Sequence, residues 1–306
     1  MNNKKILNIL IFLIPFLLLI SCSQNKSSSK ADDGAVLNDK LTNLNISLLL
    51  DLSDRIDPEI NPNQAKRDQE AILSVVEYFK NHVKNKSALT LKDKMRVIFH
   101  PPPESDNIPE LVESLSVNFE EEDINKEKIF NELTPTYKNN IPDIFEVATS
   151  REKYEGSDIW HFMKDDVRRR CIISDPNHNI KYRNILVILT DGYMYWPYDK
   201  RNEGNRYNHI TGGYEHFNQF RNPNTNLLNT KFEEEDYGFI SVQDSLQNLE
   251  ILVLGISTSK DHQEDLDIIK KYWSKWFDEM NVKKYEILKT GFPSTTEDAI
   301  NNFLNN

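Results

Sequence analysis

The sequence predicts an α/β fold, in which a doubly wound, mostly parallel central sheet carries helices on both faces as a three-layer sandwich. Several short runs are rich in apolar residues, as is typical of strands buried on both faces of a sheet. These runs cover residues 45–51, 95–100, 185–190, 249–255 and 284–288. They alternate with amphipathic segments of helical periodicity, and this alternation favours parallel strands joined by crossover helices. Two of the runs end at aspartates, Asp51 and Asp191.

The helical segments show apolar residues at spacings of three and four. Between the first two strands, residues 63–84 place Ile72, Val76 and Phe79 on one face. Further helices are expected over residues 126–133 and 142–149, from 156 onward, around 266–280, and at the C-terminal end. A short strand is expected over residues 115–119. The run Ser294-Thr295-Thr296-Glu297 matches a capping box, which predicts that the last helix begins there.

The first twenty-two residues have the pattern of a secretory signal, with Lys4 and Lys5 before an apolar run over residues 6–20. The run ends in Leu19-Ile20-Ser21-Cys22, which resembles the lipobox of bacterial lipoproteins. That resemblance implies cleavage before Cys22 and acylation of its thiol. An uncleaved membrane anchor is the alternative, but the run is shorter than the roughly 20 residues that span a bilayer. We expect a lipid-anchored protein of the bacterial cell envelope, with the outer membrane favoured.

Residues 23–40 are rich in Ser, Lys, Asn and Asp and are expected to form a flexible tether. The folded domain is expected over residues 41–306, without a second domain. It contains one long polar and aromatic insertion over residues 193–237, after the strand that ends at Asp191. An insertion of this length is uncommon within a compact domain and is often functional.

Composition narrows the class of protein. The chain has 306 residues and a formal net charge of −11, so nucleic acid is not expected as a partner, because phosphate binding needs clustered positive charge. Its two cysteines are Cys22 and Cys171; lipidation of the first leaves the second as a small buried residue without a disulfide partner. The chain contains no phosphate-binding loop, dinucleotide fingerprint, zinc-protease motif or serine-hydrolase elbow. We therefore do not expect an enzyme.

Oxygen-bearing side chains follow two of the predicted strands. Asp51 and Ser53 come after the first strand, and Asp191 lies in the run Thr190-Asp191-Gly192 after another. In an open parallel sheet, ligands bind outside the carboxyl ends of the strands, so these side chains are expected to share one edge. Carboxylates and hydroxyls suit a hard cation such as Mg²⁺. The pattern predicts a cation site at this edge.

At these residues the chain resembles a von Willebrand factor A-type domain, over roughly residues 45–303. The family's metal-ion-dependent adhesion site has an Asp-x-Ser-x-Ser motif, a threonine that opens a middle helix, and a later aspartate. The resemblance implies that Asp51, Ser53, Ser157 and Asp191 hold Mg²⁺, or Mn²⁺ or Ca²⁺, with Ser157 in place of the threonine. Arg55 occupies the second serine position and cannot coordinate a cation. Arg55 is expected either to point outward or to fold back onto Asp51 or Asp191, which would leave a metal-free site.

The resemblance also implies that an open coordination position on the ion accepts a carboxylate from a protein or other envelope ligand. The aromatic insertion leaves the same edge of the sheet and is expected to form a recognition surface or a lid over the ion. The residues expected on this surface are Asp54, Arg55, Tyr193, Tyr195, Trp196 and Tyr198. The alternative is that the aromatic rings pack on one another and hold down a long loop.

The expected function is that of a membrane-anchored, extracytoplasmic binding or adhesion module assisted by a divalent cation. A metal-dependent hydrolase of phosphate esters is the first alternative, with Asp51 and Asp191 around the ion and Asp54 as the base. A structural subunit of an envelope complex with a vestigial metal site is the second.

Overall fold

The computed structural model describes residues 42–150, 153–174, 180–212, 217–221, 226–259 and 262–306. The expected signal segment, Cys22 and the tether lie outside the described residues. Residues 39–306 form one compact unit. In the described part of the chain, no helix combines the length and the apolar character needed to cross a membrane.

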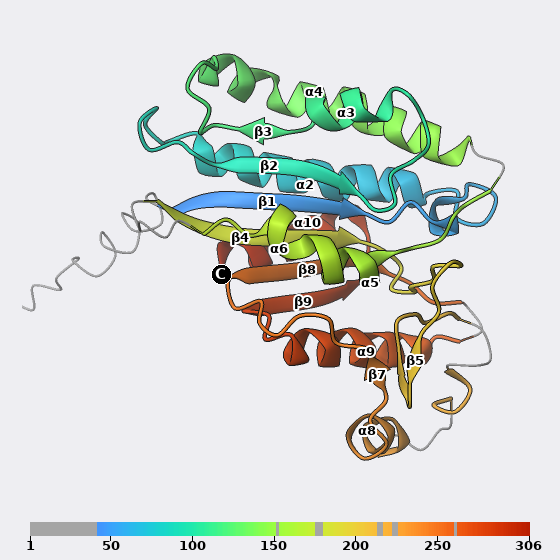
Figure 1. Cartoon of the computed structure of the whole chain (residues 1–306). Coiled ribbons are helices and arrows are strands. Elements are labelled where there is room, and N and C mark those ends of the chain that lie inside the picture. The colour runs from blue at the N-terminus through green and yellow to red at the C-terminus, as the bar shows by residue number, and fades with distance from the viewer. Residues whose placement is uncertain (1–41, 151–152, 175–179, 213–216, 222–225, 260–261) are drawn as a thin grey trace, which may run out of the picture. The chain divides into compact units, whose positions relative to one another are not determined.

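A six-stranded sheet forms the centre of the unit, in the order β3-β2-β1-β4-β8-β9 (Figure 1). Its strands are β1 (Thr42–Leu50), β2 (Lys94–Phe99), β3 (Val117–Asn118), β4 (Lys181–Leu189), β8 (Leu249–Ile256) and β9 (Lys284–Lys289). All neighbours are parallel except β3, which pairs with β2 in the antiparallel sense. The predicted strands are thus confirmed, with ends shifted by a few residues.

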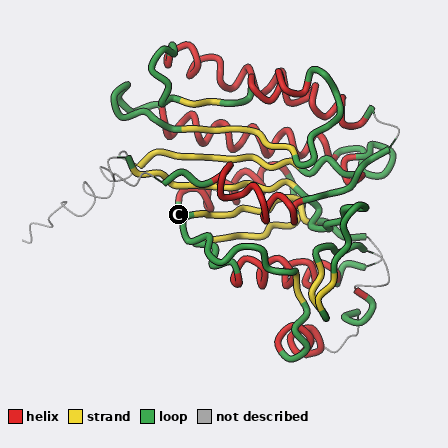
Figure 2. Tube along the Cα trace, in the orientation of Figure 1, coloured by secondary structure: helices red, strands yellow, loops and turns green. Residues whose placement is uncertain are grey.

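Helices cover both faces of this sheet, as Figure 2 shows in red. The main helices are α2 (Gln64–Val83), α3 (Ile108–Ser114), α4 (Lys126–Thr149), α5 (Ile159–His161), α6 (Val167–Cys171), α8 (Asn226–Glu233), α9 (Asp265–Glu279) and α10 (Pro293–Asn305). A π-helical turn, Phe162–Asp166, joins α5 to α6, and a 3₁₀ turn, Asp54–Ile56, follows β1. The insertion contributes β5 (Asn202–Glu203) and β6 (Arg206–Tyr207), which form a small sheet with β7 (Gly238–Phe239).

The central strands are buried on both sides, and alternate residues enter two separate cores. Leu48 and Val187 pack in one core with residues of α2, α4 and α10. Leu49 and Ile188 pack in the other core with residues of α5, α6, α9 and the insertion. The core residues among the described part of the chain all lie within this unit, and a unit with its own hydrophobic core is expected to fold by itself.

Two expectations about helix ends are wrong. The segments predicted as two helices form the single helix α4, which contains Pro135 and Pro142 in its interior. The capping box does not form, because Pro293 occupies the first turn of α10 and the N-cap is Phe292. Proline is favoured at the first helical position, and its fixed φ angle starts the helix two residues earlier than the capping box predicts.

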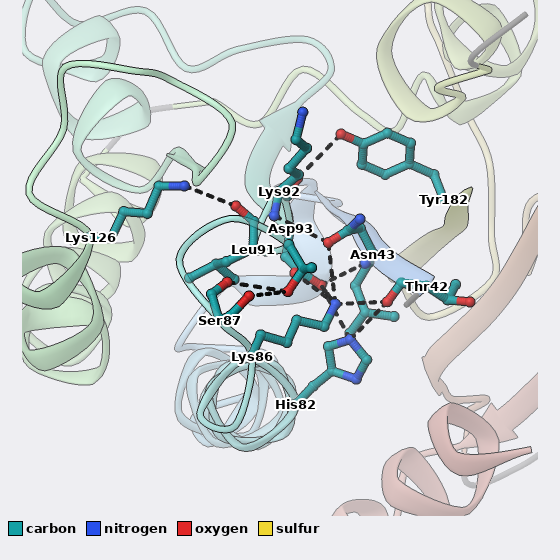
Figure 3. Close-up of polar contacts among 12 residues, drawn as sticks. Thr42, Asn43, His82, Lys86, Ser87, Leu91, Lys92, Asp93, Lys126 and Tyr182 are labelled. Atoms are coloured by element: carbon teal, nitrogen blue, oxygen red, sulfur yellow. Dashed lines mark hydrogen bonds and ion pairs between the residues drawn. The ribbon is translucent and has the colours of Figure 1, made fainter. Parts of the chain in front are cut away.

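A buried polar cluster anchors the start of β1, at the edge of the sheet opposite the aspartates (Figure 3). The ammonium of Lys86 lies 2.8 Å from one carboxylate oxygen of Asp93 and donates to the backbone carbonyl of Thr42 at 2.7 Å. Asp93 in turn accepts from the backbone N–H of Leu44, and His82 lies 3.2 Å from the same carboxylate. The cluster ties the end of α2 to the first residues of β1.

The strand order places a topological switch point between β1 and β4. From β1 the chain proceeds through β2 and β3 on one side, whereas β4 leads to β8 and β9 on the other. The connections after β1 and β4 therefore diverge, and the crevice between them is where ligands bind in open α/β sheets. Asp51 directly follows β1, and Asp191 lies two residues beyond the end of β4.

Candidate metal site

Asp51 is held by two donors at the switch point. Its side chain is 3 % exposed. One carboxylate oxygen accepts from the backbone N–H of Ser53 at 3.0 Å, and the other accepts from the hydroxyl of Thr190 at 2.7 Å. The Thr190 contact links the loop after β1 to the loop after β4. It fixes the orientation of the Asp51 carboxylate before any ligand arrives.

Asp191 is the second carboxylate of the site. One of its oxygens accepts from the backbone N–H of Tyr193 at 3.1 Å. Burial and then the negative charge of Asp51 raise the pKa of Asp191 to about 7, although the positive charge of Arg55 opposes this shift. A carboxylate whose ionised form is disfavoured by burial and by a neighbouring negative charge is stabilised strongly by a bound cation.

A cavity of about 300 Å³ brings three of the four expected metal ligands together. Its lining includes the hydroxyl-bearing Ser53 and Ser157 and the carboxylate of Asp191. Asp51 does not line this cavity. Its carboxylate accepts hydrogen bonds from the backbone N–H of Ser53 and from the hydroxyl of Thr190. The expected residues thus meet at one edge of the sheet, with Asp51 the most deeply placed.

Ser157 carries an unsatisfied polar atom in this cavity. The residue is 7 % exposed, and its buried hydroxyl has no hydrogen-bond partner within the described chain. A buried hydroxyl without a partner is costly, and its presence calls for a ligand or an ordered solvent atom. Ser157 lines the cavity that Ser53 and Asp191 also line. These oxygen donors fit a magnesium-type ion that keeps several waters.

Ser157 is positioned by a pair of backbone hydrogen bonds to the insertion. Its N–H donates to the carbonyl of Tyr195 at 2.9 Å, and the N–H of Tyr195 donates back at 3.2 Å. The preceding Gly156 has φ +103°, and a Cβ there would lie 2.3 Å from the Tyr195 carbonyl oxygen. Glycine is therefore required to bring the two segments together.

We expect Gly156→Ala to destabilise the domain by roughly 1–3 kcal/mol and to displace Ser157 from the cavity. The added methyl group imposes both an unfavourable φ and a clash with the Tyr195 carbonyl. Urea unfolding of the variant measures the loss. Gly204→Ala is the matched control, because Gly204 also has positive φ (+64°) but no heavy atom within 4 Å of a Cβ built there. If the two variants lose equal free energy of unfolding, the paired backbone hydrogen bonds between Ser157 and Tyr195 have no special role.

Both expectations for Arg55 are wrong. Arg55 is 3 % exposed, so it belongs to no binding surface, and it does not pair with the carboxylate of Asp51 or Asp191. Its guanidinium forms a bidentate pair with Asp68 of α2, at 2.7 and 3.1 Å, and donates to the backbone carbonyl of Asp51. Burial opposes the charged form, but the Asp68 pair raises the pKa of Arg55 above its usual value. The carboxylates therefore stay available to a cation.

Asp54 lines the same cavity and is exposed at its rim. Burial of part of the side chain and then the charge of Asp51 raise the pKa of Asp54. A further acid at the mouth of the cavity strengthens the negative potential there. The arrangement attracts cations and repels a free carboxylate until an ion has bound.

The aromatic insertion divides into a packed part and an exposed part. Phe217, Phe220 and Phe232 lie against Tyr272 of α9, with ring centroids 4.9 to 6.4 Å apart. These three phenylalanines agree with the alternative that the aromatic rings pack together and hold down a long loop. In the other part, Trp196 and Tyr198 stack edge to face at 5.1 Å, and Tyr198 is 77 % exposed.

The half-buried rings of Tyr193 and Tyr195 line the cavity itself. The ammonium of Lys200 lies over the Tyr195 ring, 4.7 Å from its centroid. The walls of the cavity are therefore built by the insertion. Of the expected surface residues, Asp54, Tyr193 and Tyr195 lie at the cavity, Tyr198 is exposed, and Trp196 is half-buried beside Tyr198.

Two residues of the site were not expected from the sequence. Thr190 holds the Asp51 carboxylate, and Asp68 removes Arg55 from the cavity. The triplet Thr190-Asp191-Gly192 indicated a site residue, Asp191, at the end of a strand. It gave no indication of the role of Thr190. Asp68 gave no signal, because one acid in the first turns of a helix is ordinary.

The donor set is poor in strong ligands. Within the described residues, no group of three or more His, Cys, Asp or Glu side chains is arranged to hold a metal. The candidate site has two carboxylates and two serine hydroxyls instead. Such a set favours weak, water-rich coordination of a hard cation over the tight, nitrogen- or sulfur-based coordination of zinc.

No protein-family model matches the chain, and no curated protein matches it. Among solved structures, the chain is similar to the pilus adhesin SpaC of Lactobacillus rhamnosus GG, at 12 % identity and a TM-score of 0.37 over 85 % of this chain. It is also similar to proximal thread matrix protein 1 from the mussel byssus with a zinc-occupied MIDAS motif, at 13 % identity and a TM-score of 0.34 over 86 % of this chain. The chain spans 30 % and 47 % of those two chains.

Proposed function

We propose that the domain is a von Willebrand factor A-like binding module, in which Ser53, Ser157 and Asp191 hold a divalent cation and Asp51 supports them. The observation that carries this proposal is the buried, partnerless hydroxyl of Ser157, in the same cavity as Ser53 and Asp191. The raised pKa of Asp191, caused by burial and by Asp51, is consistent with a site that gains from positive charge.

The ion would supply an open coordination position to a carboxylate of a partner. Mg²⁺ prefers octahedral oxygen coordination and usually keeps several waters, so one of these can give way to an incoming oxygen. The acidic Asp54 at the rim repels a carboxylate unless an ion is present, which makes partner binding dependent on the cation. This is the adhesion-type arrangement, and no reaction step is required of the domain.

The recognition surface would consist of Asp54, Tyr193, Tyr195, Trp196 and Tyr198. Tyrosine and tryptophan offer large contact areas with few rotatable bonds and are enriched at binding hot spots. The exposure of Tyr198 and the position of Tyr195 in the cavity wall support this surface. A lipid on Cys22 would hold the module at the envelope surface, with the outer membrane as the expected location.

The hydrolase alternative draws support from Asp54 alone. This carboxylate lines the cavity, and burial and the charge of Asp51 raise its pKa toward the range useful for a base. Turnover of p-nitrophenyl phosphate in Mg²⁺ that disappears on Asp54→Asn would favour the hydrolase. Absence of turnover together with metal binding would favour the binding module.

The test of the metal site is isothermal titration of Mg²⁺ and Mn²⁺ into the chain from Ala31 onward. We expect saturable binding with a dissociation constant of about 1 mM or below. Binding should disappear in Asp191→Ala, because the variant removes one of the two carboxylates, and should weaken in Ser157→Ala. Ser47→Ala is the matched control, since Ser47 is also a fully buried serine but lies within β1. Binding that survives Asp191→Ala would overturn the proposed site.

A further inference from the structure

A second cavity lies beside α2 and α10, and we call it the α2–α10 cavity. Its volume is about 410 Å³, within the range of small-molecule sites. Residues of α2, α9 and α10 line it together with the ends of β4, β8 and β9. It shares no lining residue with the candidate metal site.

The floor of the α2–α10 cavity is apolar. It is formed by aliphatic side chains of strands and helices, namely Ala71, Leu189, Leu254, Leu266, Leu288 and Ala299. Leu266, Leu288 and Ala299 are half-buried, so the folded chain leaves apolar surface accessible there. Covering such surface with an apolar ligand is favourable in proportion to the area removed from water.

Three cations from three different elements line the same cavity: Arg67 of α2, Lys270 of α9 and Lys289 of β9. Within the described part of the chain, none of the three forms an ion pair. Their sequence neighbours Lys66 and Lys271 do, with Glu70 and Glu233. The chain has 48 acidic and 37 basic residues, so three convergent unpaired cations are not explained by overall composition.

The one carboxylate that lines the cavity cannot neutralise these cations. Asp68 already accepts two hydrogen bonds from the guanidinium of Arg55 and one from the amide of Gln64. The charge of the Asp68 carboxylate is therefore balanced by the guanidinium of Arg55, with which it forms a buried bidentate pair. The α2–α10 cavity therefore combines an apolar floor with a net positive lining.

We propose that the α2–α10 cavity binds an amphiphilic anion, with its aliphatic body on the leucine floor and its carboxylate or phosphate head among Arg67, Lys270 and Lys289. A neighbouring hollow continues from the cavity and shares Arg67 and Lys289 with it. The exposed ring of Phe292 lines this extension and gives a longer chain an apolar exit. The proposal does not depend on a metal in the other site.

The test is titration of dodecanoate, below its micellar concentration, into the chain from Ala31 onward. We expect saturable binding that weakens at least tenfold in Lys270→Glu and in Lys289→Glu. Lys271→Glu is the matched control, because Lys271 neighbours Lys270 on α9 but pairs with Glu233. Its affinity for dodecanoate should equal that of the unmodified chain. Dodecanol should bind more weakly than dodecanoate and should not respond to Lys270→Glu.

Two further arms complete the test. Sedimentation with phosphatidylglycerol vesicles that is lost in Lys270→Glu would identify a lipid head group as the source of the anion. Binding of free dodecanoate without vesicle binding would identify a soluble amphiphile, and both results support the site. No dodecanoate binding at millimolar concentration, or equal binding by the Lys270→Glu and Lys271→Glu variants, would overturn it. Circular dichroism of each variant verifies the fold.

Discussion

Replacing Arg55 with methionine is expected to lower the free energy of unfolding by about 3–5 kcal/mol. Methionine fills much of the volume of the arginine but leaves the Asp68 carboxylate buried at 4 % exposure, with Gln64 as its remaining side-chain donor. A buried charge that loses its partner still bears the cost of desolvation, and no opposite charge remains nearby to offset that cost. Urea unfolding followed by tryptophan fluorescence gives the change directly, since Trp273 and Trp276 are fully buried.

The double variant Arg55→Met with Asp68→Leu is the control. It removes both charges, so most of the lost stability should return, as replacement of a buried pair by apolar groups is often neutral. If Arg55→Met lowers the free energy of unfolding by less than about 1 kcal/mol, the Arg55–Asp68 pair contributes no more than an exposed ion pair does. That result would contradict the prediction for a buried pair. A double variant no more stable than the single one would show that the unpaired Asp68 charge is not the cause.

Asp191→Asn is expected to stabilise the domain in the absence of divalent cations, increasingly as the pH rises from about 4 to 7. Burial and the charge of Asp51 raise the pKa of Asp191 from 3.8 to about 7 in the folded state. Between these values the folded state holds a proton that the unfolded state has released. The contribution of Asp191 to stability is therefore fully present below its unfolded pKa and is lost as the pH rises through 7.

The whole difference corresponds to roughly 4 kcal/mol at most. Urea unfolding of both proteins in EDTA at pH 4 to 8 measures it, and other titrating groups cancel because both proteins carry them. Saturating Mg²⁺ should narrow the difference at pH 8 by about 2.7 kcal/mol, because an ion at 100 times its dissociation constant stabilises the original chain by that amount. A difference between the two proteins that does not change with pH would contradict the raised pKa of Asp191.

The mostly parallel sheet and the edge that carries Asp51 and Asp191 follow from features that the sequence displays directly. Strands buried on both faces are mostly apolar, so the second halves of β1 and β4 are visible as the runs Leu48–Leu50 and Ile185–Leu189. A polar residue after such a run marks the end of the strand. Parallel strands bring those ends to one edge, which is why the shared position of the two aspartates was predictable from the sequence.

The position of Arg55 was not predictable in the same way. Its partner Asp68 lies thirteen residues later on another element, and the pairing depends on how α2 packs beside the loop after β1. The single helix α4 escaped prediction for a related reason. Tertiary packing, which buries Tyr137 and Ile141 between the two prolines, outweighs the local cost of Pro135 and Pro142 inside a helix.

The insertion was predictable in composition and not in arrangement. Its phenylalanines and its outer tyrosines have similar sequence surroundings, yet Phe217 is fully buried and Tyr198 is largely exposed. The difference arises from α9, whose aromatic face covers one part of the insertion and does not reach the other. No local pattern in the chain encodes which ring meets that helix.

The position of β1 has a mechanical consequence. Thr42 lies at one end of this strand, and the Asp51 site lies at the other end. Tension between the two ends runs lengthwise along β1, across its backbone hydrogen bonds to β2 and β4. Bonds loaded in shear must break together, whereas bonds at a peeling edge break one after another. Lys86 adds a further restraint at the carbonyl of Thr42. A load applied between Thr42 and the Asp51 site would therefore be resisted by the whole length of β1 at once.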